Sequence, residues 1–191
     1  MDYKSICWFS IMTTLFPLLA MGQERMLFQF NNAQELQAWR SVNDGVMGGR
    51  STGRVSYDGD GALDFSGYLS LENNGGFASI RAASPRMELK PNDVIFIRVR
   101  GDGRKYSFNI YTQPNLRGVS YRQTFKTTQG KWTVVALPVS KFVATFRGRT
   151  NASNRLNAAS AAGVGFLLGD KKQGPFNLEV DWIKAVNSGA K

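Results

Sequence analysis

Arginine and carboxylate side chains are the groups through which this chain could do chemistry. Histidine is absent, and the only cysteine is Cys7. Ser-His-Asp and Cys-His catalysis need a base or nucleophile that such a chain lacks. Zinc sites built on imidazole or thiolate, haem with a His ligand and thiolate-held iron–sulfur clusters are excluded on the same ground. We therefore expect a protein that is not an enzyme and has no metal or other cofactor.

Carboxylates leave two weaker alternatives open. Glu179 and Asp181 alternate along one strand-like run, so a hydrolase with a carboxylate pair is conceivable, although such pairs are common on β-sandwiches. A calcium site could use Asp44, Asp102, Asp170 or Asp181 with backbone carbonyls, but no EF-hand spacing supports it. We favour neither alternative.

The stretch "SVNDGVMGGRS" at 41–51 concentrates glycines and turn-forming residues. Asn-Asp-Gly is a strong turn signal, and the Gly48-Gly49 pair allows close approach of a second backbone segment. One interpretation is a rigid corner with Val46 and Met47 packed beneath the sheet. The other is a wall of a binding site, since loops on rigid sandwiches often carry function. Its polar groups would be Asn43, Asp44, Arg50 and Ser51, beside the turn that holds Arg100, Asp102 and Arg104.

About ten short runs rich in β-branched and aromatic residues fill the rest of the chain. Glycine-rich turns such as "DGDG" at 58–61 and "NNGG" at 73–76 separate them. This pattern predicts an all-β protein, an antiparallel sandwich or barrel, as a single domain over residues 23–191. One short helix is predicted within 154–162.

Alternation along the strands predicts which side chains face the core. In "DVIFIRVRG", Ile95, Ile97 and Val99 alternate with Arg98 and Arg100. The last strand is expected to direct Phe176, Leu178, Val180 and Trp182 inward. If several strands are neighbours in one sheet, its outer face carries Arg98, Arg100, Asn109, Tyr111, Arg122 and Arg147, with Arg149 close by. Such a face could grip an anionic or sugar-like ligand, or it could simply be solvated.

The N-terminal segment resembles an export signal. Lys4 precedes the apolar run "ICWFSIMTTLFPLLAM", and "AMG" places small residues just before Gln23. The run is shorter than the roughly 20 apolar residues of a spanning helix. We expect residues 1–22 to be a signal peptide and the protein to be exported, periplasmic or secreted, with an N-terminal membrane anchor as the alternative.

The chain is strongly basic, with a formal net charge of +10 at pH 7. Such a surface attracts anions such as acidic glycans or anionic lipid, which allows peripheral membrane association. Export argues against nucleic acid as the partner.

An ordered set of motifs resembles a known family. "VNDGVMGGRS" at 42–51, "NNGGFASIR" at 73–81, "YRQTF" at 121–125 and "GVGFLLGDKKQGPFNLEVDWIKA" at 163–185 are similar to the complex I intermediate-associated protein 30 family. The resemblance implies a galactose-binding-like jelly-roll sandwich. It also implies a non-enzymatic, chaperone-like role in assembling the membrane arm of NADH dehydrogenase.

Two functional hypotheses follow. The first is a binding or assembly-assisting module whose partners are proteins, respiratory-complex subunits among them, held by the basic sheet face and the Gly-rich loop. The second is an exported carbohydrate-binding domain of the cell envelope that recognises acidic glycans.

Overall fold

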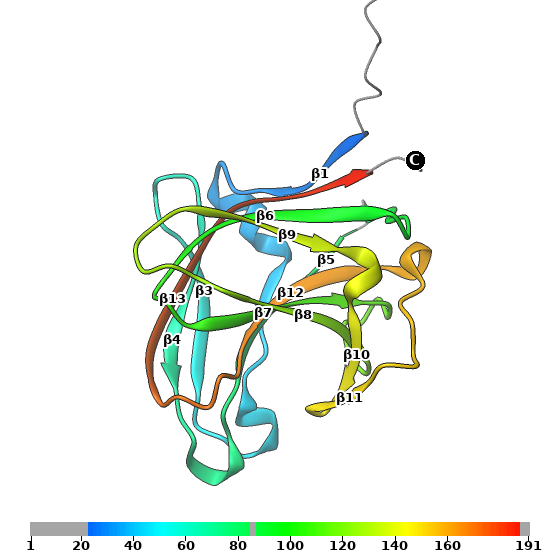
Figure 1. The fold of residues 1–191 in the computed structure, drawn as a ribbon. Coiled ribbons are helices and arrows are strands. Elements are labelled where there is room, and N and C mark those ends of the chain that lie inside the picture. Colours follow the sequence, from blue (N-terminus) through cyan, green and yellow to red (C-terminus); the bar gives the residue numbers. More distant parts are fainter. Residues whose placement is uncertain (1–22, 85–86, 188–191) are drawn as a thin grey trace, which may run out of the picture.

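The computed structural model describes residues 23–84 and 87–187. Its regular structure is almost entirely β, in two antiparallel sheets stacked as a sandwich (Figure 1). The predicted all-β antiparallel sandwich is confirmed. The predicted signal peptide lies outside the described residues.

The first sheet has six strands. Its order is β3 (Thr52–Tyr57), β4 (Leu63–Leu69), β13 (Gly174–Asn187), β6 (Asp93–Gly101) and β9 (Thr133–Pro138), and β1 (Glu24–Gln29) also pairs with β13. Because β1 lies along the second half of β13, the two ends of the described chain lie side by side (Figure 1).

The second sheet has seven strands. Its order is β11 (Arg149–Asn151), β10 (Val143–Phe146), β8 (Ser120–Lys126), β7 (Lys105–Tyr111), β12 (Gly163–Leu168), β5 (Ala78–Ala83) and β2 (Trp39–Ser41). We call it the seven-stranded sheet, and the other the six-stranded sheet.

Among the described residues, helical structure is confined to short 3-10 turns. They are η1 (Ala33–Ala38), η2 (Asp44–Met47), η3 (Glu72–Asn74), η4 (Val139–Lys141) and η5 (Ala158–Ser160). The helix predicted within 154–162 is reduced to η5. Across residues 23–84 and 87–187, no helix is long and apolar enough to cross a membrane.

The core lies between the sheets and is rich in aromatic rings. Phe166 contacts Phe108 edge to face, with ring centroids 5.2 Å apart, and stacks on Trp39 at 5.9 Å. Such pairs add to the stabilisation that burial of the rings provides. The predicted inward set Ile95, Ile97 and Val99 is fully buried, as the strand alternation requires.

The last strand departs from its predicted alternation. Phe176, Leu178 and Val180 are buried as expected, but the pairing of β13 with β6 shifts between Val180 and Trp182. Beyond this irregularity Ile183 is buried, whereas Trp182 is only partly so. The prediction that Trp182 faces the core is therefore wrong, because one irregular position reverses which residues point inward.

Candidate binding groove

A groove of about 1210 Å³ lies over the face of the seven-stranded sheet that turns away from the core. Its base comes from β5, β7, β8 and β12. Its sides come from the Gly-rich loop around η2, the loop at 115–118 and the β10–β11 turn. In Figure 1 the β10–β11 hairpin stands at one side of this sheet.

The strand register places a row of long cationic side chains across this face. Directly opposed residues on antiparallel neighbours point to the same side of a sheet. The register therefore aligns Arg40, Arg81, Gly165, Asn109, Arg122 and Val143 on six adjacent strands. Gly165 leaves the middle of the row without a side chain.

Arg81 is held against the base of the groove. Its guanidinium carbon lies 5.0 Å from the ring centroid of Tyr111, and Nη1 donates a hydrogen bond to the Leu116 carbonyl at 2.7 Å. A cation over an aromatic face is stabilised by about 0.5–2 kcal/mol. The Arg81 Nε is buried and has no hydrogen-bond partner among the described residues.

Arg122 approaches from the opposite side of Gly165. Its Nε donates to Asn109 Oδ1 at 2.9 Å, and Asn109 Nδ2 donates to the Tyr111 hydroxyl at 3.4 Å. Burial lowers the pKa of the Arg122 guanidinium; Tyr111 opposes this shift and the nearby Arg81 charge adds to it. Burial also raises the pKa of Tyr111, while the two arginines act against that shift. The Arg122 guanidinium nevertheless remains charged at neutral pH.

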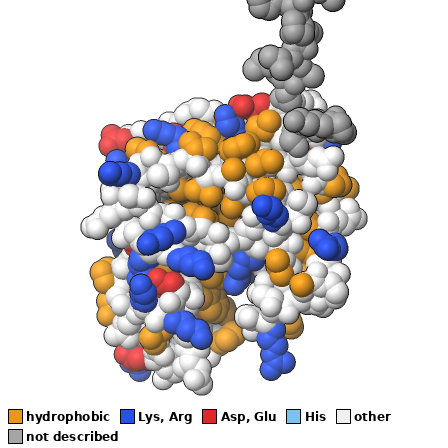
Figure 2. Space-filling model, viewed as in Figure 1, with side chains coloured by type: hydrophobic (Ala, Val, Ile, Leu, Met, Phe, Trp, Pro, Cys, Tyr) orange, Lys and Arg blue, Asp and Glu red, His pale blue; other side chains and the backbone are white. Residues whose placement is uncertain are grey.

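The groove lining is basic. No carboxylate of the described residues lines the groove. Five arginines do: Arg40, Arg81, Arg117, Arg122 and Arg147. Figure 2 likewise shows more basic than acidic side chains on the face in view. The concentration of positive charge favours an anionic group in the groove.

Asp44 fixes the Gly-rich loop. Its side chain accepts hydrogen bonds from the backbone of Ser51 at 2.8 Å, of Gly76 at 2.7 Å and of Phe77 at 3.3 Å, and from the Ser51 hydroxyl at 2.5 Å. Burial opposes ionisation, but these donors outweigh it and lower the pKa of Asp44. A Cβ on Gly49 would lie 2.4 Å from Asp44 Cγ, whereas one on Gly48 would meet nothing within 4 Å. The close approach therefore occurs at Gly49 alone, and it comes from the Asp44 side chain rather than from the predicted second backbone segment.

The apolar tip of the same loop lies in solvent. Val46 is 73% and Met47 63% exposed, so the prediction that they pack beneath the sheet is wrong. The hydrogen bonds of Asp44 hold η2 in place without their help. Both residues line the groove, and Phe146, which is 49% exposed, lines it from the β10–β11 side.

Four of the predicted site residues line the groove: Asn43, Tyr111, Arg122 and Arg147. A fifth, Asn109, lies in its base and accepts a hydrogen bond from Arg122. The Nδ2 of Asn43 donates to the Gly53 carbonyl at 2.9 Å and so also supports the loop. Tyr111 is only 2% exposed and Asn109 is fully buried. The expected solvent-facing surface is thus replaced by a base of buried polar groups under arginine side chains.

The predicted single basic face does not exist, because Arg98 and Arg100 belong to the six-stranded sheet. Arg98 pairs with Asp181 and Arg100 with Glu179, and both guanidinium groups lie within 5 Å of the Trp132 ring centroid. Consecutive strands β6 and β7 belong to different sheets. Glu179 and Asp181, the carboxylates of the hydrolase alternative, thus form ion pairs with these two arginines.

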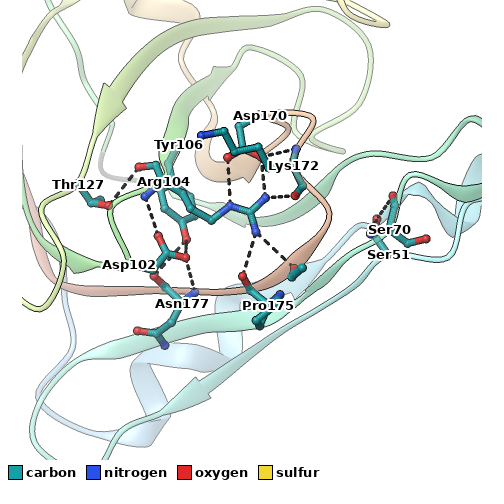
Figure 3. Close-up of polar contacts among 11 residues, drawn as sticks. Ser51, Ser70, Asp102, Arg104, Tyr106, Thr127, Asp170, Lys172, Pro175 and Asn177 are labelled. Carbon is teal, nitrogen blue, oxygen red and sulfur yellow. Dashed lines mark hydrogen bonds and ion pairs between the residues drawn. The ribbon is translucent and has the colours of Figure 1, made fainter.

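Asp102 and Arg104 organise a different end of the sandwich, shown in Figure 3. Asp102 Oδ2 accepts from the Tyr106 hydroxyl at 3.0 Å and from the Asn177 backbone at 3.0 Å, and Arg104 binds Asp170 through two nitrogens. Ser51, bonded to Ser70, lies apart from this cluster in Figure 3. The expected juxtaposition of the Gly-rich loop with this turn is wrong.

The remaining predicted residues lie outside the groove. Arg50 forms an exposed ion pair with Glu72 at 3.0 Å, Arg149 is exposed on β11, and Ser51 is buried against Asp44. The sequence reasoning missed Arg40, Arg81 and Gly165. Alternation in "ASIRAA" and "GVGFLL" could have placed Arg81 and Gly165 on an outer face.

Within the described residues, no group of three or more His, Cys, Asp or Glu side chains could hold a metal ion. The four aspartates of the calcium alternative are engaged elsewhere. Asp44 accepts from amides and a hydroxyl, Asp170 binds Arg104, and Asp181 binds Arg98.

Comparisons with known proteins assign the chain to a protein family. The family model described as complex I intermediate-associated protein 30 (CIA30) matches residues 28–180. The chain belongs to the CIA30 family. Complex I intermediate-associated protein 30, mitochondrial, of Mus musculus is 32% identical over 188 residues, covering 85% of this chain and 56% of that protein. The Drosophila melanogaster protein of the same name is 26% identical, covering 85% of this chain and 62% of that protein. The chain thus spans under two thirds of these relatives.

Carbohydrate-binding modules are among the solved structures similar to this CIA30 chain. The family 11 module from Clostridium thermocellum, in complex with a β-1,3-1,4-mixed-linked tetrasaccharide, has a TM-score of 0.66 at 17% identity, covering 90% of this chain and 99% of the module. A family 30 module of a Clostridium thermocellum cellulase has a TM-score of 0.58 at 12% identity, covering 88% and 99%. These likenesses establish the fold, which agrees with the predicted galactose-binding-like sandwich.

The predicted export of this CIA30 chain is contradicted by its relatives, which are named as mitochondrial proteins. Residues 1–22, on which the prediction rested, lie outside the described residues. An apolar N-terminal run with one preceding lysine is too general a pattern to identify a compartment. Export therefore no longer serves as a ground against nucleic acid.

Gly165 of this CIA30 chain allows a direct test of how the groove base is built. A Cβ there would lie 2.4 Å from the Ile80 carbonyl oxygen and 3.2 Å from Arg81 Cγ and Tyr111 Cε2. We expect Gly165→Ala to lower the free energy of unfolding by about 1–3 kcal/mol, because the neighbouring strand must shift. Gly45→Ala, whose Cβ would meet nothing within 4 Å, is expected to change it by less than about 0.5 kcal/mol. Urea unfolding measures both, and equal effects would contradict the crowding at Gly165.

Proposed function

We propose that this CIA30 chain is a protein-binding module that assists assembly of respiratory complex I. In this proposal the partner lies in the groove of the seven-stranded sheet and contacts the Gly-rich loop. The observation that carries it is the exposed apolar rim, Val46 and Met47 on one side and Phe146 on the other, around a basic interior. Large apolar side chains beside a concave surface are typical of interaction sites.

Family membership supports the assembly role, since the relatives are named complex I intermediate-associated proteins. Of the predicted site residues, the proposal keeps Asn43, Asn109, Tyr111, Arg122 and Arg147. Arg98 and Arg100 are not part of it, because they belong to the six-stranded sheet.

We propose further that the module works without catalysis. The chain has no histidine. Carboxylates that could act as acid or base are engaged in ion pairs, as Glu179, Asp181 and Asp170 are. The groove is lined by arginine, apolar and neutral polar side chains, and no carboxylate of the described residues lines it.

Carbohydrate binding is the second candidate, favoured by the fold shared with a module in complex with a tetrasaccharide. Sugar rings commonly stack on an exposed aromatic face, as aromatic side chains offer a flat apolar surface. Tyr111 is only 2% exposed and lies under Arg81, so its ring is not accessible for this purpose. Phe146 is exposed in the groove, but the guanidinium of Arg147 lies over its ring, 5.3 Å from the centroid. The groove therefore favours a protein partner.

The test of the protein-binding proposal is affinity capture with variants of the exposed apolar residues. Tagged wild-type protein, Met47→Ser/Phe146→Ser and the control Tyr68→Ser/Val134→Ser would be expressed in cells with an active respiratory chain. The control removes exposed apolar groups from the six-stranded sheet. Membranes would be solubilised gently, and the captured proteins quantified by mass spectrometry.

We expect complex I subunits with the wild type and the control, and at least about fivefold less with the groove variant. Equal recovery by both variants would exclude the groove, and no enrichment of complex I subunits with the wild type would overturn the assembly role. Binding of neutral β-glucan oligosaccharides by the purified wild type, lost only in the groove variant, would favour the carbohydrate alternative.

A further inference from the structure

Arg81 and Arg122 are half-buried cationic side chains of the groove that have no carboxylate partner in the described part of the chain. Five described arginines pair with carboxylates: Arg25, Arg50, Arg98, Arg100 and Arg104. Arg81 and Arg122 form no such ion pair with any carboxylate in the described part of the chain, although both are half-buried. Partly buried charges are costly unless they are paired.

The two guanidinium groups flank one point of the sheet. Arg81 lies directly opposite Gly165 on β12, which lies opposite Asn109 on β7, which in turn lies opposite Arg122 on β8. Gly165 carries no side chain, which makes room for the Tyr111 ring and the stem of Arg81, since a Cβ there would lie 3.2 Å from Tyr111 Cε2 and from Arg81 Cγ. Tyr111 contacts the guanidinium of Arg81, and Asn109 orients Arg122.

Each guanidinium group keeps donors for a ligand. The Arg81 Nε is buried, so a ligand cannot reach it, and Nη1 donates to the Leu116 carbonyl, which leaves Nη2 as the nitrogen that can serve a ligand. Arg122 uses its Nε on Asn109, which leaves its two terminal nitrogens for another acceptor. Guanidinium forks match the two oxygens of a carboxylate, and such charge-assisted bonds are about twice as strong as neutral ones.

We propose that Arg81 and Arg122 form a carboxylate subsite, which receives an aspartate or glutamate side chain from an acidic segment of the partner protein. This inference rests on the proposed function and adds the chemistry of the partner. Arg40, Arg117 and Arg147 extend the positive charge along the groove and select a segment with several acids. Val46, Met47 and Phe146 contact apolar residues that flank those acids.

The test uses the full chain and defined probes. The first probe is a short fluorescein-labelled peptide of alternating leucine and glutamate, and the second replaces every glutamate with glutamine. Fluorescence anisotropy gives the Kd of each at low and moderate salt. Binding of oligogalacturonate, a glycan that carries carboxylates, is measured directly by isothermal titration calorimetry.

The variant Arg81→Gln/Arg122→Gln removes the subsite. Its matched control, Arg98→Gln/Arg100→Gln, removes the same net charge from the six-stranded sheet. A third variant, Arg81→Lys/Arg122→Lys, keeps the charge and loses the fork geometry, so it remains informative should the glutamine variant fold poorly. Thermal unfolding establishes that each variant is folded.

We expect the glutamate peptide to bind at least about tenfold more tightly than the glutamine peptide, and Arg81→Gln/Arg122→Gln to lose at least about tenfold in affinity. The control should lose less than about threefold, and the lysine variant should fall between them. Equal losses in the subsite and control variants would show a purely non-specific charge effect and overturn the subsite. Equal binding of the two peptides would do so as well.

Binding of oligogalacturonate without binding of the glutamate peptide would overturn the acidic-protein proposal in favour of an acidic glycan. The outcome also separates this inference from the assembly role. Loss of peptide binding in the subsite variant, with no complex I subunits captured by the wild type, would retain the subsite and reject the assembly role. Capture of complex I subunits by the wild type, together with equal binding of the glutamate and glutamine peptides, would retain the assembly role and reject the subsite.

Discussion

Asp44→Ala is expected to lower the free energy of unfolding by about 3–5 kcal/mol. The side chain is fully buried and accepts hydrogen bonds from Ser51, Gly76 and Phe77. Without it, these donors remain near the interior with no acceptor, and the contact between the Gly-rich loop and the segment before β5 is lost. Urea unfolding of the wild type and the variant measures the difference.

Asp60→Ala is the control, because Asp60 is exposed in the turn before β4. We expect it to change the free energy of unfolding by no more than about 0.5 kcal/mol. A loss at Asp44 as small as that at Asp60 would show that the loop does not depend on this carboxylate.

The role of Asp44 also predicts a pH dependence. The fold lowers its pKa, because donors from Ser51, Gly76 and Phe77 outweigh the effect of burial. The stabilisation by the ionised form is therefore fully present above its ordinary pKa of about 4 and is lost as the pH falls through the lowered value in the folded protein. The difference between wild type and Asp44→Asn should shrink from pH 7 to the acid range, and a constant difference would contradict this.

Arg104→Met is expected to lower the free energy of unfolding by about 3–5 kcal/mol, since it breaks a largely buried ion pair on one side only. Arg104 Nε lies 3.0 Å from Asp170 Oδ2, and Nη2 lies 2.7 Å from Asp170 Oδ1. The same guanidinium donates to the Lys172 and Pro175 carbonyls, so it fastens the β12–β13 connection to the start of β7 (Figure 3).

Arg50→Met makes the same chemical change at an exposed ion pair with Glu72. We expect a loss of no more than about 1 kcal/mol there, because solvent screens the pair. Chemical denaturation of both variants gives the comparison, and similar losses would mean that Asp170 finds other partners when Arg104 is removed.

Local patterns in the sequence were sufficient for the strands and for the inward side chains of β6. Alternating Ile95, Ile97 and Val99 occupy the core because successive side chains of a strand point to opposite faces. The rigid-corner interpretation of the Gly-rich loop agrees with the contact that glycine at 49 permits with Asp44, but not with the exposure of Val46 and Met47. The family motifs likewise predicted the sandwich.

Alternation could not tell which strands share a sheet. Arg98 and Arg100 on β6 were grouped with Asn109 and Tyr111 on β7, because strands joined by short turns are usually neighbours. In the fold the intervening turn carries the chain from one sheet to the other, so these residues face different surfaces. Similarly, the irregularity after Val180 depends on pairing with β6 and leaves no mark in the strand's own composition.

The sequence by itself therefore determined the all-β architecture, the family and the absence of histidine and thiol chemistry beyond Cys7. Only the tertiary structure decided that Arg81 and Arg122 flank Gly165 and that Val46 and Met47 lie in solvent. The reason is physical: a residue's direction within a strand follows from its immediate neighbours. The groups that surround it are brought from distant parts of the chain by the pairing and packing of the sheets.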